Sequence, residues 1–238
     1  MTHSNIIQPQ DATDLATGLA SLSTGDLVYS GLKQRILGHE LEMGAPLREE
    51  DVANWFESSR APARDALRRL EQEGLVVRNG RRYAIRSFTY HEVMITYRQR
   101  AALEFLAVEY AVKRGRAALA PVEAILEQQK LAFAAATRSQ FSQLDRAFHL
   151  ALAELSGQPL LVNELSIILD RVQLLRTTEL RRDAGPQGAY LDHCRIFDAL
   201  KRGQASIAQA ELEYHYATTV RLHADLDTAE VTTPPEMR

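Results

Sequence analysis

The sequence has few of the features that mark secreted, disulfide-bonded or membrane proteins. Its 238 residues include one cysteine, Cys194, so an internal disulfide is impossible and a reducing cytoplasm is the expected compartment. No apolar run approaches the length that spans a bilayer. Residues 1–24 lack the basic cluster and apolar core of a secretory signal. We therefore expect a cytoplasmic protein without a membrane partner.

The overall charge is also small, at −3, and by itself indicates no particular partner. Its distribution is uneven, however, because residues 60–86 contain eight arginines and only three acids. A basic segment within a weakly acidic chain is a candidate binding surface for a polyanion. The alternative is a solvated helix face, on which Arg64 or Arg68 pairs with Asp65 or Glu71.

Three short helices are predicted after residue 25. Apolar spacing indicates the first over 26–37, and the second over 49–56 follows a turn at 43–46. Ser59 can cap the third helix, which ends at Gly74. Their succession is typical of a helix-turn-helix.

A β-hairpin is predicted directly after the third helix. Two β-prone runs, 75–78 and 81–85, are joined by Asn79-Gly80, a pair that accepts positive φ at both turn positions. Helices followed by a hairpin form a winged helix-turn-helix, whose third helix enters the major groove of DNA. This order predicts a DNA-binding domain.

The rest of the chain is predicted to be all helical. From about 91 to 226 we expect six helices forming an antiparallel bundle, and the first has an apolar stripe at Met94, Tyr97, Ala101, Phe105, Val108 and Val112. The expected organisation is a flexible leader (1–24), a winged helix-turn-helix (25–88), a helical domain (89–227) and a tail (228–238). The fold class is thus mostly α.

Four residues of the helical part form a candidate metal site. Asp145 and His149 are spaced i, i+4, while His193 and His215 occupy apolar stripes of two later helices. Inward histidines and an inward aspartate are costly to bury unless they are paired or ligated. Imidazole with carboxylate suits a divalent Zn, Ni, Mn or Fe ion. Each histidine taken alone is more often an ordinary hydrogen-bonded core residue.

Two stretches resemble the GntR family of bacterial regulators: Ser59–Leu70 (SRAPARDALRRL) and the following Glu73-Gly74-Leu75-Val76. The helical half resembles the FadR-type effector domain of that family, and six rather than seven helices resemble its VanR branch. Two departures stand out. Glu50 occupies the place of a phosphate-contacting arginine, and Glu57-Ser58 replaces the usual Gly-Val.

The resemblance implies a homodimeric repressor that binds a palindromic operator in double-stranded DNA and is nucleoid-associated when bound. It implies contacts to DNA from Ser59, Arg60, Arg64, Arg68, Arg78, Arg81 and Arg82. It also implies that a small organic acid binds at the metal, with Arg100 as its cationic partner and Arg171 and Arg176 as weaker candidates. An i, i+4 pair with Glu104 is the alternative role of Arg100.

Two other functions stay open at this point. One is a metal-dependent enzyme that uses the Asp/His residues, although the sequence supplies no nucleophile or evident base. The other is an architectural DNA binder with a purely structural helical half. The enzyme leaves the arginine-rich helix unexplained, and the architectural binder would show no response to a ligand. A regulator that is not an enzyme is the preferred interpretation.

Overall fold

The computed structural model describes residues 23–134, 138–175 and 187–221, and the chain divides into two compact units between Ser87 and Phe88. Residues 1–22 of the predicted leader, the predicted tail and the candidate ligand residue Arg176 lie outside the described residues, while Ser23 and Thr24 of that leader begin a helix. Each unit is described below by itself.

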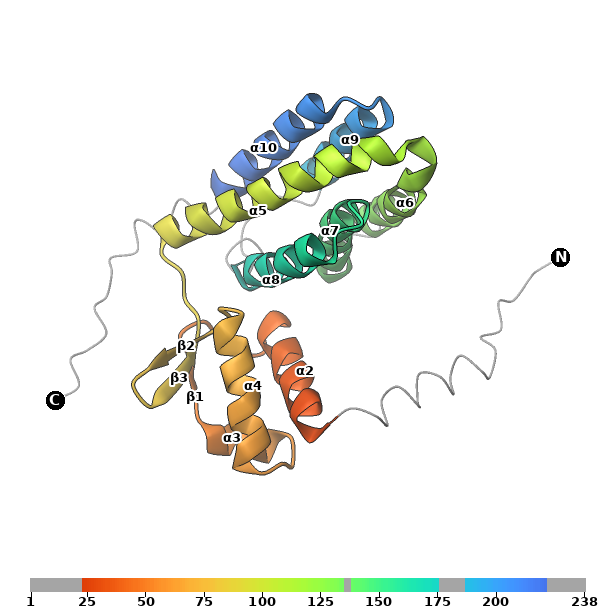
Figure 1. Ribbon diagram of the computed structural model, residues 1–238. Coiled ribbons are helices and arrows are strands. Elements are labelled where there is room, and N and C mark those ends of the chain that lie inside the picture. The colour runs from red at the N-terminus through yellow and green to blue at the C-terminus, as the bar shows by residue number, and fades with distance from the viewer. Residues whose placement is uncertain (1–22, 135–137, 176–186, 222–238) are drawn as a thin grey trace, which may run out of the picture. The chain divides into compact units, whose positions relative to one another are not determined.

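The first unit contains three helices and a small sheet, as predicted (Figure 1). The elements are α2 (Thr24–Leu37), β1 (Pro46–Leu47), α3 (Glu49–Trp55), α4 (Arg60–Gln72), β2 (Val76–Asn79) and β3 (Arg82–Ile85). A capping box between Ser23 and Asp26 begins α2. Apolar side chains of α2 and α4 form the core, namely Val28, Leu32, Ile36, Ala63, Ala66, Leu67 and Leu70. This is a winged helix-turn-helix.

The sheet differs from the prediction in two details. Pro46, predicted as the end of a turn, and Leu47 form a short strand that pairs with β3, giving the antiparallel order β1-β3-β2. The hairpin loop is Gly80-Arg81 rather than Asn79-Gly80, since Asn79 pairs with Arg82. Gly80 has a φ of +63°, and no positive φ occurs at Asn79 or Arg81. A loop with glycine first fits this single positive φ, and it places Arg81 at the tip of the wing.

One arginine of the basic segment, Arg69, connects helices α2 and α4. Arg69 on α4 forms an ion pair of 2.8 Å with Asp26 and stacks over the Tyr29 ring, whose centroid lies 3.8 Å from the guanidinium carbon. Lys33 on α2 forms a second pair with Glu73, at 2.7 Å. These contacts fix the angle between α2 and α4, and therefore the direction in which α4 presents its remaining arginines.

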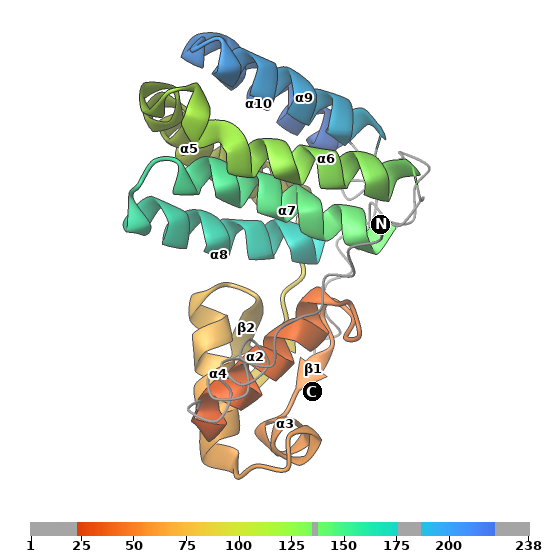
Figure 2. The same ribbon diagram turned by 90° about the vertical axis from the view of Figure 1, so that its right-hand side faces the viewer.

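The second unit is a bundle of six α-helices among the described residues, as predicted (Figures 1 and 2). These are α5 (Tyr90–Ala111), α6 (Ala120–Ala134), α7 (Arg138–Glu154), α8 (Pro159–Leu175), α9 (Gln187–Lys201) and α10 (Ala205–Arg221), with two short 3₁₀ turns, Val112–Arg114 and Arg116–Leu119. Helix α5 packs against α7, α8 and α10, and α6 packs against α7 and α9. Among the described residues, no helix is both long and apolar enough to cross a membrane.

The buried face of α5 lies one residue earlier in the sequence than predicted. The fully buried residues are Val93, Thr96, Tyr97, Arg100, Glu104, Ala107, Val108 and Ala111, whereas most of the predicted stripe is only partly buried. The predicted stripe consisted of apolar residues alone. The bundle also buries Arg100 and Glu104 on the inward face of the helix, which moves that face.

Candidate metal centre and DNA-binding face

Helix α4 presents a row of arginines on the side opposite its buried residues. Arg60, Arg64 and Arg68 are exposed, and Arg60 and Arg64 have side-chain exposures of 65% and 54%. Ser59 is the N-cap residue as predicted, but its side chain makes no capping hydrogen bond. The Ser59 hydroxyl therefore accepts no hydrogen bond from the first backbone N–H groups of α4.

The first two arginines of this row pair with acids of α3. Arg64 donates two hydrogen bonds of 2.8 Å to the carboxylate of Glu49, and Arg60 lies 3.2 Å from Glu50. The expected local partners of the arginines were Asp65 and Glu71 on the same helix. The actual partner of Arg64 comes from the neighbouring helix, because the helix-turn-helix brings the start of α3 beside the start of α4.

The wing contributes the other arginines predicted to contact DNA. Arg78, Arg81 and Arg82 are all exposed on or between β2 and β3. Arg78 donates to the Gly80 carbonyl at 2.9 Å and lies over the Tyr83 ring. Exposed arginines on both the third helix and the wing are the arrangement that the winged fold uses to bind DNA.

The turn before α4 contains a backbone conformation that glycine favours. Glu57 has a φ of +48°, in the left-handed region, although it carries a side chain. This explains why a family with this turn favours glycine there. Glu57 is exposed, so its carboxylate adds negative charge near the arginine row.

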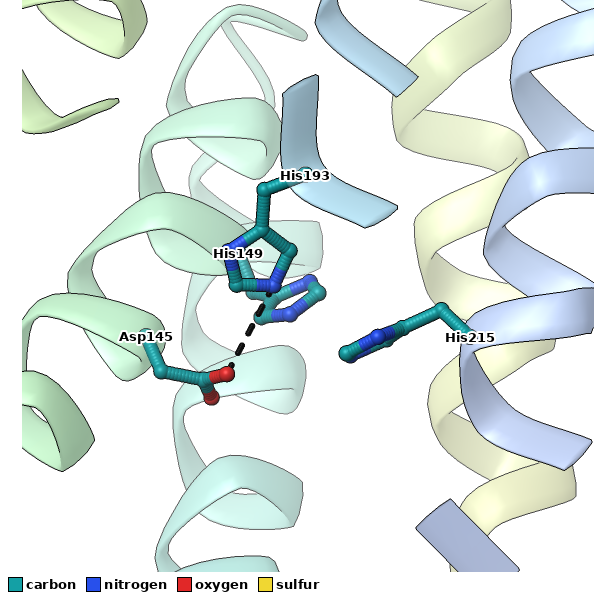
Figure 3. A group of neighbouring side chains, drawn as sticks. All are labelled: Asp145, His149, His193 and His215. Carbon is teal, nitrogen blue, oxygen red and sulfur yellow. Dashed lines mark ion pairs between the residues drawn. The ribbon is translucent and has the colours of Figure 1, made fainter. Parts of the chain in front are cut away.

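In the second unit, the structure brings the four predicted metal ligands together. Asp145 and His149 extend from α7, His193 from α9 and His215 from α10, with their side chains converging (Figure 3). One ligand atom from each lies within 4.8 Å of the others, and all four residues are buried. Two ligands on opposite sides of an ion at about 2.1 Å are about 4 Å apart, so this spacing is close to what one ion requires.

Each histidine of this Asp/His cluster is oriented by a hydrogen bond at Nδ1. The acceptors are Glu104 for His149 at 2.6 Å, Gln129 for His193 at 2.9 Å and Asp192 for His215 at 3.1 Å. Gln129 is itself fixed, because its amide donates to the Leu144 carbonyl at 3.0 Å. Partners of this kind select the tautomer whose Nε2 carries a free lone pair, as metal-binding histidines require.

The three Nε2 atoms are left without hydrogen bonds although they are buried. The carboxylate of Asp145 lies 3.5 Å from Nε2 of His193. A buried nitrogen without a partner costs free energy, and three that converge on one carboxylate are unusual. The donor set therefore fits a divalent ion.

The electrostatics favour neutral imidazoles, which are the form that binds metal. Burial and the nearby Arg100 guanidinium lower the pKa of His149 to about 4. Burial also lowers the pKa of His193 well below its usual value, although Asp145 opposes the shift. Burial raises the pKa of Glu104, but His149 and Arg100 outweigh it and lower the pKa to about 2.

The candidate cation Arg100 is completely buried beside this cluster. Its Nε donates to Glu104 at 2.7 Å, so the alternative i, i+4 pair is present. Its two terminal nitrogens, Nη1 and Nη2, are buried and make no hydrogen bond. Arg100 therefore has both roles available: it holds Glu104, and it retains donors for an anion. Arg171 on α8 is partly buried and already engaged by neighbouring groups.

Sequence reasoning missed the three residues that orient the histidines. Glu104 entered only as a possible partner of Arg100, and nothing in the sequence marks Gln129 as inward-facing among the polar residues of α6. Asp192 precedes His193, but it serves His215 on the neighbouring helix. Only the packing of α9 against α10 reveals that role.

The comparisons with known proteins agree with both halves of this description. The sequence profile of the FCD domain matches residues 96–218, and that of "Bacterial regulatory proteins, gntR family" matches residues 24–83. The chain belongs to the GntR family of bacterial transcription regulators. Regulators of this family bind DNA operators, and FCD domains bind small-molecule effectors.

Named relatives of this GntR-family regulator are transcription regulators as well. An uncharacterized HTH-type transcriptional regulator, YdhC of Bacillus subtilis (strain 168), is 30% identical over 79% of this chain and 85% of its own. The HTH-type transcriptional repressor RspR of Escherichia coli (strain K12) is 24% identical over 79% of this chain and 83% of its own. The solved E. coli McbR/YncC has a TM-score of 0.72 at 22% identity, covering 86% of this chain and 99% of its own, which shows the shared fold. The regulator function is thus confirmed, and the enzyme alternative is not favoured.

Proposed function

We propose that this regulator is a homodimeric repressor that dissociates from its operator when a small carboxylate binds at a divalent metal ion in the helical unit. One observation carries the proposal: the three buried Nε2 atoms of His149, His193 and His215 converge on Asp145 without hydrogen-bond partners. Zn, Ni, Mn and Fe all accept such donors.

The metal would attract the acid, and the protein would orient it. Four protein ligands leave coordination positions open on an ion that prefers six, and a carboxylate oxygen is a suitable further ligand. Arg100 is linked to the Asp/His cluster through Glu104, whose carboxylate binds both Arg100 and His149. Its two unpaired Nη groups supply charge-assisted hydrogen bonds for a second oxygen of the acid.

On the DNA side, we assign base contacts to Arg60 and base or backbone contacts to Arg64. Ser59, Arg68 and the wing arginines 78, 81 and 82 would contact the backbone, with the wing tip along the minor groove. An arginine fork that meets guanine discriminates by about 1–3 kcal/mol. One recognition helix buries too little surface for regulatory affinity, which supports a dimer on a two-fold operator.

The coupling between the two functions would pass through α5. This helix carries both Arg100 and Glu104, and only residues 86–89 separate its first residue from the last residue of β3. A ligand shifts a conformational equilibrium only by its differential affinity for the two states. A difference of about 1–3 kcal/mol, generated when the helices close on the acid, is sufficient for allosteric release.

The experiment has two stages. A thermal-shift screen of small organic acids, with and without chelator, identifies an acid that stabilises only the metal-loaded protein. Calorimetry then measures the affinity of that acid with and without operator DNA, for wild type, His193→Ala and the exposed-histidine control His91→Ala. We expect operator to weaken acid binding in wild type and in the control, and His193→Ala to lose acid binding.

The outcomes separate the alternatives. Equal acid affinity with and without operator would contradict the switch, and unchanged affinity in His193→Ala would contradict the role of the metal. No response to any acid or to chelator would favour an architectural DNA binder with a structural helical unit.

A further inference from the structure

A hollow of about 490 Å³ lies beside the wing, between β1, β3 and the start of α3. Leu47 and Tyr83 are among its lining residues, and Arg48, Arg81 and Arg82 also line it. Two of these arginines belong to the basic segment that the sequence indicates. Arg48 does not, because it lies twelve residues before Arg60 in a stretch rich in acids.

The strand register places Arg48 near Arg82. Leu47 of β1 pairs with Tyr83 of β3 in antiparallel register, and Arg48 keeps an extended backbone with φ −105° and ψ 140°. Arg48 and Arg82, both exposed, each lie one residue beyond this last pair, and both line the hollow. Like charges in this relation destabilise a sheet unless an anion lies between them.

Two of the three arginines, Arg48 and Arg81, lack a charge partner within the part of the chain that the structure describes. Among the described residues, neither Arg48 nor Arg81 has an ion pair or a hydrogen bond of its side chain. The acid in the hollow is Glu49, but both of its oxygens already accept from Arg64, which lowers the pKa of that carboxyl. Among the described residues, the charges of Arg48 and Arg81 in the hollow are thus left without a counter-charge.

We propose that this hollow binds a phosphate group of the DNA backbone, held by Arg48 together with Arg81 and Arg82. The inference rests on the proposed DNA-binding role of the first unit and adds Arg48 as a contact outside the recognition helix and wing strands. A backbone phosphate is favoured over a free anion because the same rigid unit carries the arginine row of α4. A duplex held by that row brings further phosphates within reach of the wing.

The test is a salt titration of duplex binding by the full-length protein. Each phosphate contact contributes about 0.9 to the slope of log K against log salt concentration. Arg48→Gln should lower that slope by about one and weaken operator and unrelated duplex by the same factor, roughly five- to tenfold near 0.1 M salt. Arg202→Gln, which removes an exposed arginine from the second unit, is the matched control and should leave the slope unchanged.

Two further measurements separate a binding role from a structural one. In the absence of DNA, Arg48→Gln should raise the melting temperature, because it removes one of two neighbouring like charges; a structural arginine would lower it. Arg48→Gln and Arg82→Gln should weaken DNA binding less than additively, since the two residues share one phosphate. Additive losses would contradict a shared phosphate.

The outcomes also distinguish this inference from the proposed function. If Arg48→Gln leaves the slope unchanged while Arg60→Ala still abolishes operator preference, the hollow is not a backbone site and the DNA-binding face stands. If inorganic phosphate stabilises wild type but not Arg48→Gln, and duplex binding is equal in both, the hollow is a free-anion site and the proposal fails. If no arginine variant affects any duplex, the DNA-binding face itself is wrong.

Discussion

The two units each contain an arginine–glutamate pair of similar separation in opposite surroundings. Arg64 and Glu49 in the DNA-binding unit are separated by 2.8 Å, with side-chain exposures of 54% and 28%. Arg100 and Glu104 in the helical unit are separated by 2.7 Å and are both fully buried. An exposed pair gains little and can exchange its partner for a phosphate, whereas a buried pair cannot lose one member without leaving a charge in an apolar interior.

This difference explains what each unit can do. The arginines of α4 can leave their glutamates when DNA arrives, because water and phosphate replace the lost contact. Glu104 must stay in place, since it binds Arg100 with one oxygen and His149 with the other. Charged side chains that can change partners suit a surface that binds and releases a polyanion. Charged side chains that are held in one place suit a site whose ligand residues must be oriented before the ligand binds.

The largest expected effect comes from breaking the buried pair. Glu104→Gln should lower the free energy of unfolding by about 3–5 kcal/mol, because Arg100 then stays buried without a counter-charge. Chemical denaturation measures the loss, and circular dichroism at zero denaturant verifies that the variant is folded. A loss below about 1 kcal/mol would mean that the interior relaxes enough to hydrate Arg100.

The second prediction concerns pH in the metal-free protein. An unfolded histidine takes up its proton near pH 6.5, whereas folded His149 resists protonation down to about pH 4. The unfolded state therefore binds more protons between these values, so stability falls as the pH drops through this window. Denaturation in chelator at several pH values measures the slope.

His149→Asn should flatten that slope, and His91→Asn, which changes an exposed histidine, should leave it as in wild type. Equal slopes in wild type and His149→Asn would contradict the buried neutral state of His149.

The comparison of the two units also shows what the sequence can predict. Spacing was sufficient to place four residues on inward faces, since His193 and His215 lie within apolar stripes and Asp145 and His149 lie beside one. It failed for α5, where Arg100 and Glu104 are buried because they satisfy each other and His149. Whether a polar side chain lies inside depends on partners from other helices, which periodicity along one helix cannot reveal.

The hairpin shows the same limit at smaller scale. Asn79-Gly80 correctly marked a turn, but the register is fixed by the pairing of β3 with both β2 and β1, which moves the loop to Gly80-Arg81. The strand Pro46–Leu47 is too short to be visible as an alternating pattern. Its effect is nevertheless to place Arg48 opposite the wing.

A third, smaller effect is expected at the turn before α4. Glu57 holds a left-handed backbone at φ +48°, which costs a residue with a side chain about 1 kcal/mol. Glu57→Gly should therefore raise the stability of the first unit by about that amount, in contrast to the losses at buried charges. Glu57→Ala is the control, because alanine keeps the strain while removing the same carboxylate. Equal stabilities of the two variants would contradict the strain.

The smallest stability change should follow from breaking the exposed pair. Glu49→Gln should alter the free energy of unfolding by less than about 1 kcal/mol, because Arg64 regains water when it loses its partner. Its effect should appear in DNA binding instead, where the variant removes an acid beside the arginine row. Affinity for operator and for unrelated duplex should rise by the same factor, severalfold at low salt and less at high salt. If operator affinity falls while affinity for unrelated DNA rises, Glu49 positions Arg64 for a base contact, and the exposed pair is then as fixed in function as the buried one.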